Sequence, residues 1–236
     1  MARRRSSTLT PLLIVALLLA AAGWWLSTHW QRMPWQPLDL AAPVDRLTLL
    51  RIGRLHNDAV ECRAKLAGAQ IGFAVAPVVT GGPGCGFANG VILKGTRDIA
   101  YRPSTPMSCV TAVGLALWER QTLAPEARLL FSARVVAIET LGTYNCRRIG
   151  GGESGRLSEH ASANAIDIAA FRLSDGTRIS LLDDWQGDGP KATFLRRVRN
   201  GACGSFATVL SPDYNAAHRD HFHFDQARRG GWGVCR

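Results

Sequence analysis

Several signatures that would assign this chain to a function are missing from it. It has no C-x-x-C pair, which argues against a cysteine-ligated zinc site, and the glycine-rich residues 81–90 lack the GK[ST] ending of a phosphate-binding loop. The sequence has no internal repeat and no RNA- or DNA-binding signature, so we expect no nucleic-acid partner. Charged residues make up only 19%, yet 28 basic residues against 18 acidic ones give a net charge of +10. This balance favours anionic surroundings such as anionic lipid or a cell-wall polymer.

The N-terminal segment predicts export from the cytoplasm. Arg3, Arg4 and Arg5 precede an apolar run from Pro11 to Leu26, and positive charge before such a run keeps the N-terminus inside the cell. The run is shorter than the roughly 20 residues of a full membrane span. Small residues at 20–22 offer a cleavage site, which would make the segment a signal peptide.

Tryptophans favour an uncleaved anchor over a signal peptide. Four of them (Trp24, Trp25, Trp30 and Trp35) follow the run, as residues at a membrane interface do. We therefore expect a single-pass helix in the inner membrane with the C-terminal domain in the periplasm; the alternative is release into the periplasm after cleavage. The expected parts are a cytoplasmic basic tail (1–10), the anchor (11–28), a proline-containing linker (29–46) and one folded domain (47–236).

All the cysteines lie beyond this segment, on the side expected to be exported. An even number there predicts up to three disulfides. Six cysteines allow 15 pairings, and the sequence does not choose among them. The candidates are Cys62, Cys85, Cys109, Cys146, Cys203 and Cys235.

The remaining pattern predicts an α+β fold, an antiparallel sheet with flanking helices. Residues 104–123 begin with a capping-type Ser or Thr and Pro106 and then read as a helix; residues 189–201 read as a short amphipathic helix. Strands are expected over 133–147, over the hairpin 165–182 with its turn at Asp175-Gly176, and at FATVL and HFHFD near the C-terminus.

Four of the six histidines lie in two stretches, SEHASANAIDI (158–168) and HRDHFHFD (218–225). Because residues i and i+2 of a strand point to the same side, His221 and His223 should project together while the intervening phenylalanines face the core. Asp167 lies between two isoleucines that face the other way. A carboxylate in that position is costly to bury unless a cation compensates it.

Zinc suits these residues because it binds imidazole nitrogen and carboxylate oxygen, and catalytic zinc keeps three protein ligands and one open position. His160, Asp167 and one histidine of the H-x-H pair would supply the three ligands. The other histidine would then be free for proton transfer. The competing interpretation is a hydrogen-bonded His160–Asp167 pair beside histidines on a strand surface, with no metal.

The order S-x-H-x(6)-D followed by H-x-H resembles the metallopeptidases that include lysostaphin, the D-Ala-D-Ala peptidases and the hedgehog-type domains. The stretches YNCRR, LSEHASANAIDIAAFRLSDG, DDW, FLRRVRNGAC and VLSPDYNAAHRDHFHFD resemble the bacterial extensin-like C-terminal domain proteins, over roughly residues 55–236. The proline-rich repeats of plant extensins are absent from this chain. The resemblance implies a metallopeptidase-like core.

The resemblance also implies roles for single residues. His160, Asp167 and His223 match zinc ligands, and His221 matches the histidine that assists catalysis beside the metal. His218 is a second candidate base, from the H-x-x-H-x-H spacing of murein endopeptidases. For substrate binding, Arg147 matches an arginine that holds a substrate carboxylate in carboxypeptidases, and Ser158 matches a residue near the ligand loop.

Two departures from the peptidase pattern stand out. Ala163 replaces a glycine, which should be tolerated. The Glu-x-x-His arrangement that supplies a base in the D-Ala-D-Ala dipeptidases is missing. Asp220 and His221 occupy the corresponding part of the sequence. Glu159 is adjacent to a ligand but should point away from the ligands. The general base is therefore left open between His221 and His218.

The expected function is that of a membrane-anchored zinc-dependent hydrolase of the D,D-peptidase type, which cleaves amide bonds in peptidoglycan peptides. The alternative is a non-catalytic, zinc-containing module that binds or organises the cell wall. A zinc hydrolase acting on an ester is a third possibility, because fold and metal do not dictate the substrate. The sequence leaves the oligomeric state open.

Overall fold

The computed structural model describes residues 9–30, 33, 35–94 and 99–236, and the chain divides into two units, residues 1–37 and Leu38–Arg236. In the first unit, α1 (Leu9–His29) has 21 residues. At about 1.5 Å per residue this helix is about 31 Å long, close to the roughly 30 Å hydrocarbon core of a bilayer. It carries no Asp, Glu, Lys or Arg, and Pro11–His29 is apolar enough to cross a membrane. The helix therefore suits either a membrane anchor or a signal sequence.

The helix extends beyond the apolar run predicted from the sequence. Hydroxyl groups near its C-terminal end bond back to the preceding turn: Ser27 Oγ donates to the carbonyl of Trp24, and Thr28 Oγ1 donates to the carbonyl of Trp25. These polar side chains are thus satisfied within the helix, which lets it continue past Leu26.

The second unit begins at Leu38, so the last part of the segment expected to be a linker belongs to it. Leu38 and Leu40 are buried in the hydrophobic core, and the backbone N–H of Val44 donates to Gln121 Oε1. The helix α2 (Thr48–Arg54) follows, and then the short 3₁₀ helix η2 (Leu55–Asn57) and α3 (Ala59–Gly68).

A mixed sheet with the strand order β12-β10-β11-β8-β7-β5 forms the centre of this unit, and β9 also pairs with β8. The four central strands pair antiparallel as expected, but the edge pairs β5–β7 and β10–β12 are parallel. The first exception has a simple cause: helices connect β5 to β7, and a crossover of this kind returns the chain in the same direction. The strands are β5 (Ala100–Arg102), β7 (Val135–Gly142), β8 (Ala165–Leu173), β9 (Arg178–Ser180), β10 (Thr208–Leu210), β11 (Phe222–Asp225) and β12 (Val234–Cys235).

The unit also contains two smaller sheets. One has the order β1-β4-β6 and the other pairs β2 with β3. They consist of β1 (Phe73–Val75), β2 (Val79–Thr80), β3 (Gly86–Phe87), β4 (Gly90–Leu93) and β6 (Met107–Ser108).

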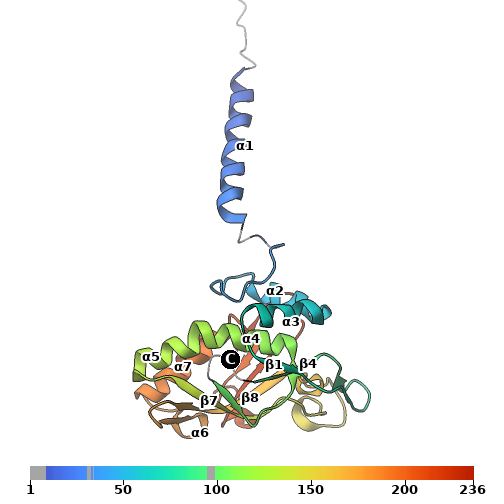
Figure 1. The fold of residues 1–236 in the computed structure, drawn as a ribbon, viewed down its shortest axis with the longest axis vertical. Coiled ribbons are helices and arrows are strands. Elements are labelled where there is room, and N and C mark those ends of the chain that lie inside the picture. Colours follow the sequence, from blue (N-terminus) through green and yellow to red (C-terminus); the bar gives the residue numbers. More distant parts are fainter. Residues whose placement is uncertain (1–8, 31–32, 34, 95–98) are drawn as a thin grey trace, which may run out of the picture. The chain divides into compact units, whose positions relative to one another are not determined.

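The helix α4 (Cys109–Trp118) is the core helix, and all ten of its residues are buried. Its N-cap is Ser108, whose Oγ accepts from the backbone N–H of Thr111. The helix begins later than the predicted start near Pro106, because Met107 and Ser108 first pair with β4. It continues through a π-helical turn (Glu119–Leu123) into α5 (Ala124–Phe131), and both helices lie along one side of the sheet (Figure 1).

Aromatic side chains join α4 to the sheet. Trp118 packs edge-on against Phe224 and tilted against Phe171, at ring-centroid distances of 5.4 and 6.1 Å. Phe171 also contacts Phe194 of α7 (Pro190–Ala202), the amphipathic helix predicted for residues 189–201. The hairpin β8–β9 with its turn at residues 175–176 is likewise present, and β9 leads into the short α6 (Leu181–Asp184).

All six cysteines form disulfides, as the even count predicts. The pairs are Cys62–Cys109, Cys85–Cys146 and Cys203–Cys235. The first joins α3 to the start of α4, and the third joins the end of α7 to the edge strand β12. The second anchors the loop that follows β7, which leads toward the candidate site.

Candidate metal centre

Strand register places two of the expected ligands opposite each other. His223 of β11 pairs with Asp167 of β8, so their side chains project from the same face of the sheet. On the other face, Ile166 and Ile168 of β8 and Phe222 and Phe224 of β11 are fully buried, as the alternation in the sequence predicts.

The third residue, His160, comes from a 3₁₀ helix, η5 (Glu159–Ser162), just before β8. Ser158 is the N-cap of this helix, and its Oγ accepts from the backbone N–H of His160 at 3.3 Å. His160 is 2% exposed and His223 8% exposed, so both rings are held inside the protein rather than on a strand surface.

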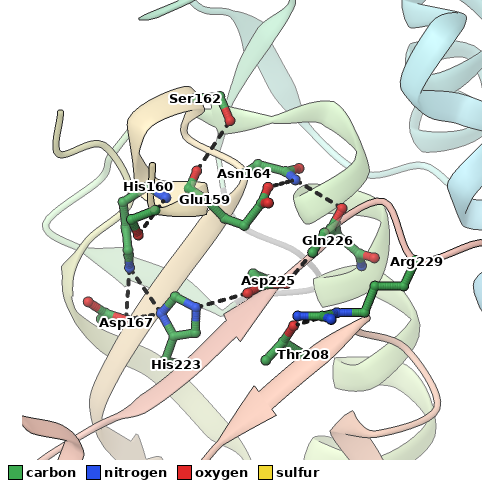
Figure 2. Close-up of polar contacts among 12 residues, drawn as sticks. Glu159, His160, Ser162, Asn164, Asp167, Thr208, His223, Asp225, Gln226 and Arg229 are labelled. Atoms are coloured by element: carbon green, nitrogen blue, oxygen red, sulfur yellow. Dashed lines mark hydrogen bonds and ion pairs between the residues drawn. The ribbon is translucent and has the colours of Figure 1, made fainter. Parts of the chain in front are cut away.

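Three side-chain atoms meet in a nearly equilateral triangle (Figure 2). His160 Nε2 lies 3.1 Å from Asp167 Oδ1 and 3.1 Å from His223 Nδ1, and His223 Nδ1 lies 3.0 Å from Asp167 Oδ1. This is the set of residues that sequence spacing selected as ligands, and among the described residues it is a group that could hold a metal ion.

The outer nitrogens of both rings have acceptors of their own. His160 Nδ1 lies 3.0 Å from the carbonyl oxygen of Thr143, and His223 Nε2 lies 3.1 Å from Asp225 Oδ2. Since a carbonyl and a carboxylate can only accept, each outer nitrogen must carry the hydrogen. In the neutral rings the inner nitrogens are then lone pairs directed at the triangle.

This arrangement leaves three acceptors facing one another without a donor. Two imidazole lone pairs and a carboxylate oxygen at 3.0–3.1 Å repel one another unless a proton or a cation lies between them. A proton on one ring satisfies part of the triangle, whereas a divalent cation would satisfy all of it. A hydrogen-bonded His160–Asp167 pair alone does not explain why the third acceptor is there.

The donor set and its dimensions suit zinc. With bonds of about 2.0–2.1 Å to nitrogen and oxygen, the edges of a tetrahedral site are about 3.3 Å long. The three edges observed are within about 0.3 Å of that length. Three protein ligands would leave one position open, which is typical of catalytic rather than structural zinc.

The protonation of the metal-free triangle follows from its charges. Burial alone would lower the pKa of His223, but its bonds with Asp167 and Asp225 outweigh burial and raise the pKa to about 9. Burial would raise the pKa of Asp167, yet the bonds from His160 and His223 hold it well below its ordinary value. Near neutral pH the metal-free site therefore keeps Asp167 ionised and His223 charged, with a hydrogen on each ring nitrogen.

The two further histidines lie beside the triangle but outside it. His221 Nε2 is 3.7 Å from Asp167 Oδ1, and its Nδ1 is 2.8 Å from Asp220 Oδ1, which can hold the hydrogen on Nδ1. His218 Nδ1 is bound to Asn215 Oδ1 at 2.7 Å, and its ring centroid is 5.2 Å from that of His221. Burial, and then the charges of His221 and His223, lower the pKa of His218 to about 4.

This difference ranks the two candidate bases. Both rings have one nitrogen fixed by an acceptor, which leaves Nε2 available for proton transfer. Only His221 has a carboxylate as that partner, and a carboxylate stabilises the imidazolium that forms when the ring takes a proton. His218, with its low pKa, is a weak base near neutral pH.

The substrate-binding candidates differ in position. Arg147 is exposed at the rim of an open hollow beside the Cys85–Cys146 disulfide, and its positive charge contributes to the low pKa of His218. Ser158 has an internal task as the cap that positions His160. Its contact with a substrate stays a prediction.

Sequence reasoning missed the groups that orient the ligands. Asp225 is two residues after His223 on the same strand, so the i, i+2 rule that grouped the histidines would also have found it. Thr143 contributes a backbone carbonyl, which no side-chain pattern shows. Its placement follows an irregular end of β7, where register shifts next to Gly142 (φ 128°) turn the chain toward η5.

Asn164 is a third missed residue, and it joins the segments that carry the ligands. Its Oδ1 accepts from Ser108 Oγ, and its Nδ2 donates to Glu159 Oε2 and to the carbonyl of Gln226. Glu159 therefore turns to Asn164 rather than to the ligands, as expected (Figure 2). The amide ties the start of α4, η5 and the end of β11 together around the triangle.

Fold and site together define an α+β domain with three disulfides and a buried His-Asp-His centre. The family model described as extensin-like protein C-terminus matches residues 60–236, and the chain belongs to this family. Comparison with curated proteins and with solved structures gave no match. The relation to metallopeptidases stays a prediction.

Proposed function

We propose that this protein is a zinc-dependent hydrolase of the D,D-peptidase type that cleaves amide bonds in peptidoglycan peptides. In this proposal α1 anchors it in the inner membrane and the domain faces the periplasm. The observation that carries the proposal is the triangle of His160, Asp167 and His223, in which two imidazole nitrogens and a carboxylate oxygen converge at 3.0–3.1 Å. The three disulfides support an oxidising, exported location.

The proposal assigns a task to each group at the centre. The three ligands would hold zinc, which when bound lowers the pKa of water and polarises a carbonyl group. The Thr143 carbonyl and Asp225 fix the rings that present the ligand nitrogens.

Proton transfer falls to His221. Its Nε2 takes a proton from the attacking water and later donates it to the leaving amine, while Asp220 stabilises the charged ring. Arg147 is the candidate to bind a peptide carboxylate, because its charge already acts on this side of the site. The excess of basic residues supports an anionic, cross-linked polymer as the substrate.

Zinc content and hydrolysis test the proposal together. We expect about one zinc per chain in the full-length protein in detergent, and none in the double variant H160A/D167A. Purified muropeptides should be cleaved by the zinc-loaded protein and not after treatment with a chelator. Cleavage that persists in a metal-free variant would refute the proposal.

A second variant separates the enzyme from a non-catalytic zinc module. His221→Ala leaves the three ligands in place, so zinc should stay bound while hydrolysis falls by about 10²–10⁴-fold, the usual contribution of an acid–base group. His218→Ala should cost less. A protein that binds zinc and cleaves no muropeptide under any condition would support the wall-binding alternative instead.

A further inference from the structure

A separate groove adjoins η5, the 3₁₀ helix that carries His160. It has a volume of about 790 Å³, within the roughly 300–1,000 Å³ range of ligand sites. Its lining includes Glu159 and Asn164, whose side chains turn away from the ligand triangle, but none of the three ligands. The groove is therefore distinct from the candidate metal centre.

The groove is positively charged. Arg156, Arg228 and Arg229 line it, and none of them forms an ion pair with a carboxylate among the residues that the structure describes. By contrast, Arg172 and Arg178 of the sheet both pair with Glu139. Arg228 donates to the neutral amide oxygen of Asn57, and Arg229 donates to the hydroxyl of Thr208 (Figure 2). Because these partners are neutral, they do not compensate the positive charge of either guanidinium group.

The described lining also carries one negative charge. The carboxylate there belongs to Glu159, which accepts from Asn164 at 2.6 Å. Burial, and then the charge of Arg228, lower the pKa of His56, so this ring is neutral at pH 7. The three guanidinium groups outnumber this carboxylate, so the groove is net positive, and guanidinium pairs best with carboxylate or phosphate.

Trp232 adds an aromatic surface to this groove. Its side chain is 80% exposed, the highest exposure of any large hydrophobic residue in the described part of the chain, and it lies between glycines at 231 and 233. An indole has an apolar face and a polar edge, and it is rarely left so open without a partner. Its faces suit the apolar C–H face of a sugar ring.

The groove is also extended. A second hollow of about 330 Å³ shares His56, Arg228, Arg229 and Trp232 with it and continues along α2 past Gly53. Two adjoining hollows with one shared wall fit a chain-like ligand better than a compact one. A concave surface with one indole also fits a polymer strand better than a bilayer, which needs protruding apolar residues.

We propose that this groove binds an anionic polysaccharide chain, with Trp232 stacked on a sugar ring and Arg156, Arg228 and Arg229 on its acidic groups. In the context of the proposed function, on which the choice of a wall glycan rests, the groove would hold the strand beside the metal centre. The binding itself requires neither the metal nor hydrolysis.

Binding of peptide-free glycan strands tests the proposal. The full-length protein in nonionic detergent should bind strands from peptidoglycan, whose muramic acids carry free carboxylates once the peptides are removed. Strands with those carboxylates reduced to alcohols serve as the matched neutral ligand and should bind at least about tenfold more weakly, because they lose the charge-assisted contacts.

Two variants and their controls locate the site. The triple variant R156Q/R228Q/R229Q should weaken binding by at least about tenfold, and Trp232→Ala by about three- to tenfold. The control for the triple variant is R46Q/R102Q/R128Q, which changes three exposed arginines outside the groove. The control for the Trp232 variant is Leu182→Ala, which changes another exposed apolar residue. Both control variants should bind nearly as well as the parent. Unfolding curves of all variants check that the fold is intact.

Three results would overturn the groove proposal: equal loss in the control triple variant, no difference between acidic and reduced strands, or stronger groove-dependent binding to phosphatidylglycerol vesicles. The last would make the membrane the partner. Because the assay uses no peptide and no zinc, its result does not depend on hydrolysis, and failure of the hydrolase proposal can be distinguished from failure of the groove proposal. Conversely, a protein that cleaves muropeptides but does not bind the glycan strands would refute only the groove proposal.

Discussion

The two faces of the strands β8 and β11 are built from alternate residues of the same short segments and have opposite properties. One face carries Ile166, Ile168, Phe222 and Phe224, which are fully buried; Phe224 packs against Trp118 of α4. The other carries Asp167, His223 and Asp225, which surround the candidate metal centre. Along either strand, a side chain that packs in the core is followed directly by one that faces the candidate site.

The comparison shows that the polar face stabilises the protein only through the proton or cation that joins its acceptors. Three acceptors in contact cost free energy until a proton or a cation joins them. The apolar face offsets this cost, since each fully buried Ile or Phe contributes about 1.5–3 kcal/mol. Stability and metal binding should therefore respond to different substitutions, even at adjacent positions.

The largest effect is expected from two neighbours on β8, Ile168 and Asp167. Ile168→Ala should lower the free energy of unfolding by about 2–5 kcal/mol, because it leaves a cavity in the hydrophobic core. Asp167→Asn should remove metal binding, with affinity reduced more than about 100-fold, beyond the effect of an outer-shell partner. Its amide can donate to the ring nitrogens, so the metal-free fold should be retained. Denaturation curves and zinc titrations measure both.

A large loss of stability in the metal-free Asp167→Asn variant would contradict the separation of the two faces. Asn is a suitable replacement here because it keeps the size and shape of the side chain, so a difference reflects charge and hydrogen bonding rather than packing. Ile168→Val, a smaller deletion costing about 0.5–1.5 kcal/mol, shows whether the loss on the apolar face scales with the volume removed.

The next effect concerns Asp225, which orients His223. Asp225→Asn replaces the carboxylate that accepts from His223 Nε2 and should weaken zinc binding by about 10–100-fold, as other outer-shell partners do. Isothermal titration against the parent measures this change. Asp175→Asn, at the exposed hairpin turn, is the matched control for loss of one negative charge. If both variants bound zinc equally, Asp225 would have no positioning role.

The third prediction concerns pH. Because the pKa of His223 is raised to about 9 in the metal-free site, its ring is charged near neutral pH and must lose a proton before it binds a metal. Apparent zinc affinity should therefore rise by about tenfold per pH unit up to about pH 9. Calorimetry in buffers of different ionisation enthalpy should detect release of about one proton from this ring.

The pH dependence of stability has opposite signs in the metal-free and the zinc-loaded protein. In the metal-free protein, the raised pKa of His223 stabilises the fold fully below its ordinary value of 6.5, and this contribution is lost as pH rises toward 9. Zinc binds better over the same range, so the difference in melting temperature between zinc-loaded and metal-free protein should widen with pH. A constant difference from pH 6.5 to 9 would contradict the assignment of His223.

Much of this arrangement could be predicted from the sequence, because it depends on local alternation. The pattern AIDI on one strand and HFHFD on the other separates apolar from polar residues with a period of two. This predicted both faces, and the shared register then brought His223 opposite Asp167. The hairpin and the amphipathic helix α7 follow from equally local signals.

What could not be predicted depends on contacts distant in sequence. The disulfide partners are 32–61 residues apart. The carbonyl of Thr143 reaches His160 only through the irregular end of β7. The parallel pairing of β5 with β7 depends on where α4 and α5 return the chain, and the charged groove combines a loop near Arg156 with the C-terminal segment.

The smallest effect is expected at Ala163, in the turn that carries the chain from His160 to Asp167. Its φ of 52° is left-handed, a conformation that costs a residue with a Cβ roughly 1–2 kcal/mol. The metallopeptidase pattern that the sequence resembles usually has glycine at this position. Ala163→Gly relieves the strain but loses a buried methyl group and frees the unfolded chain, so we expect a net gain below about 1 kcal/mol.

Ala161, two residues earlier, is the matched control. It is equally buried but lies inside the 3₁₀ helix η5, where glycine brings no relief, so Ala161→Gly should destabilise the domain by about 0.5–1 kcal/mol. Opposite signs at these two positions, measured by urea denaturation, would show that the turn holds its shape against local strain. Zinc affinity should be unchanged in Ala163→Gly, since glycine adopts the same φ and leaves both ligands on the polar face.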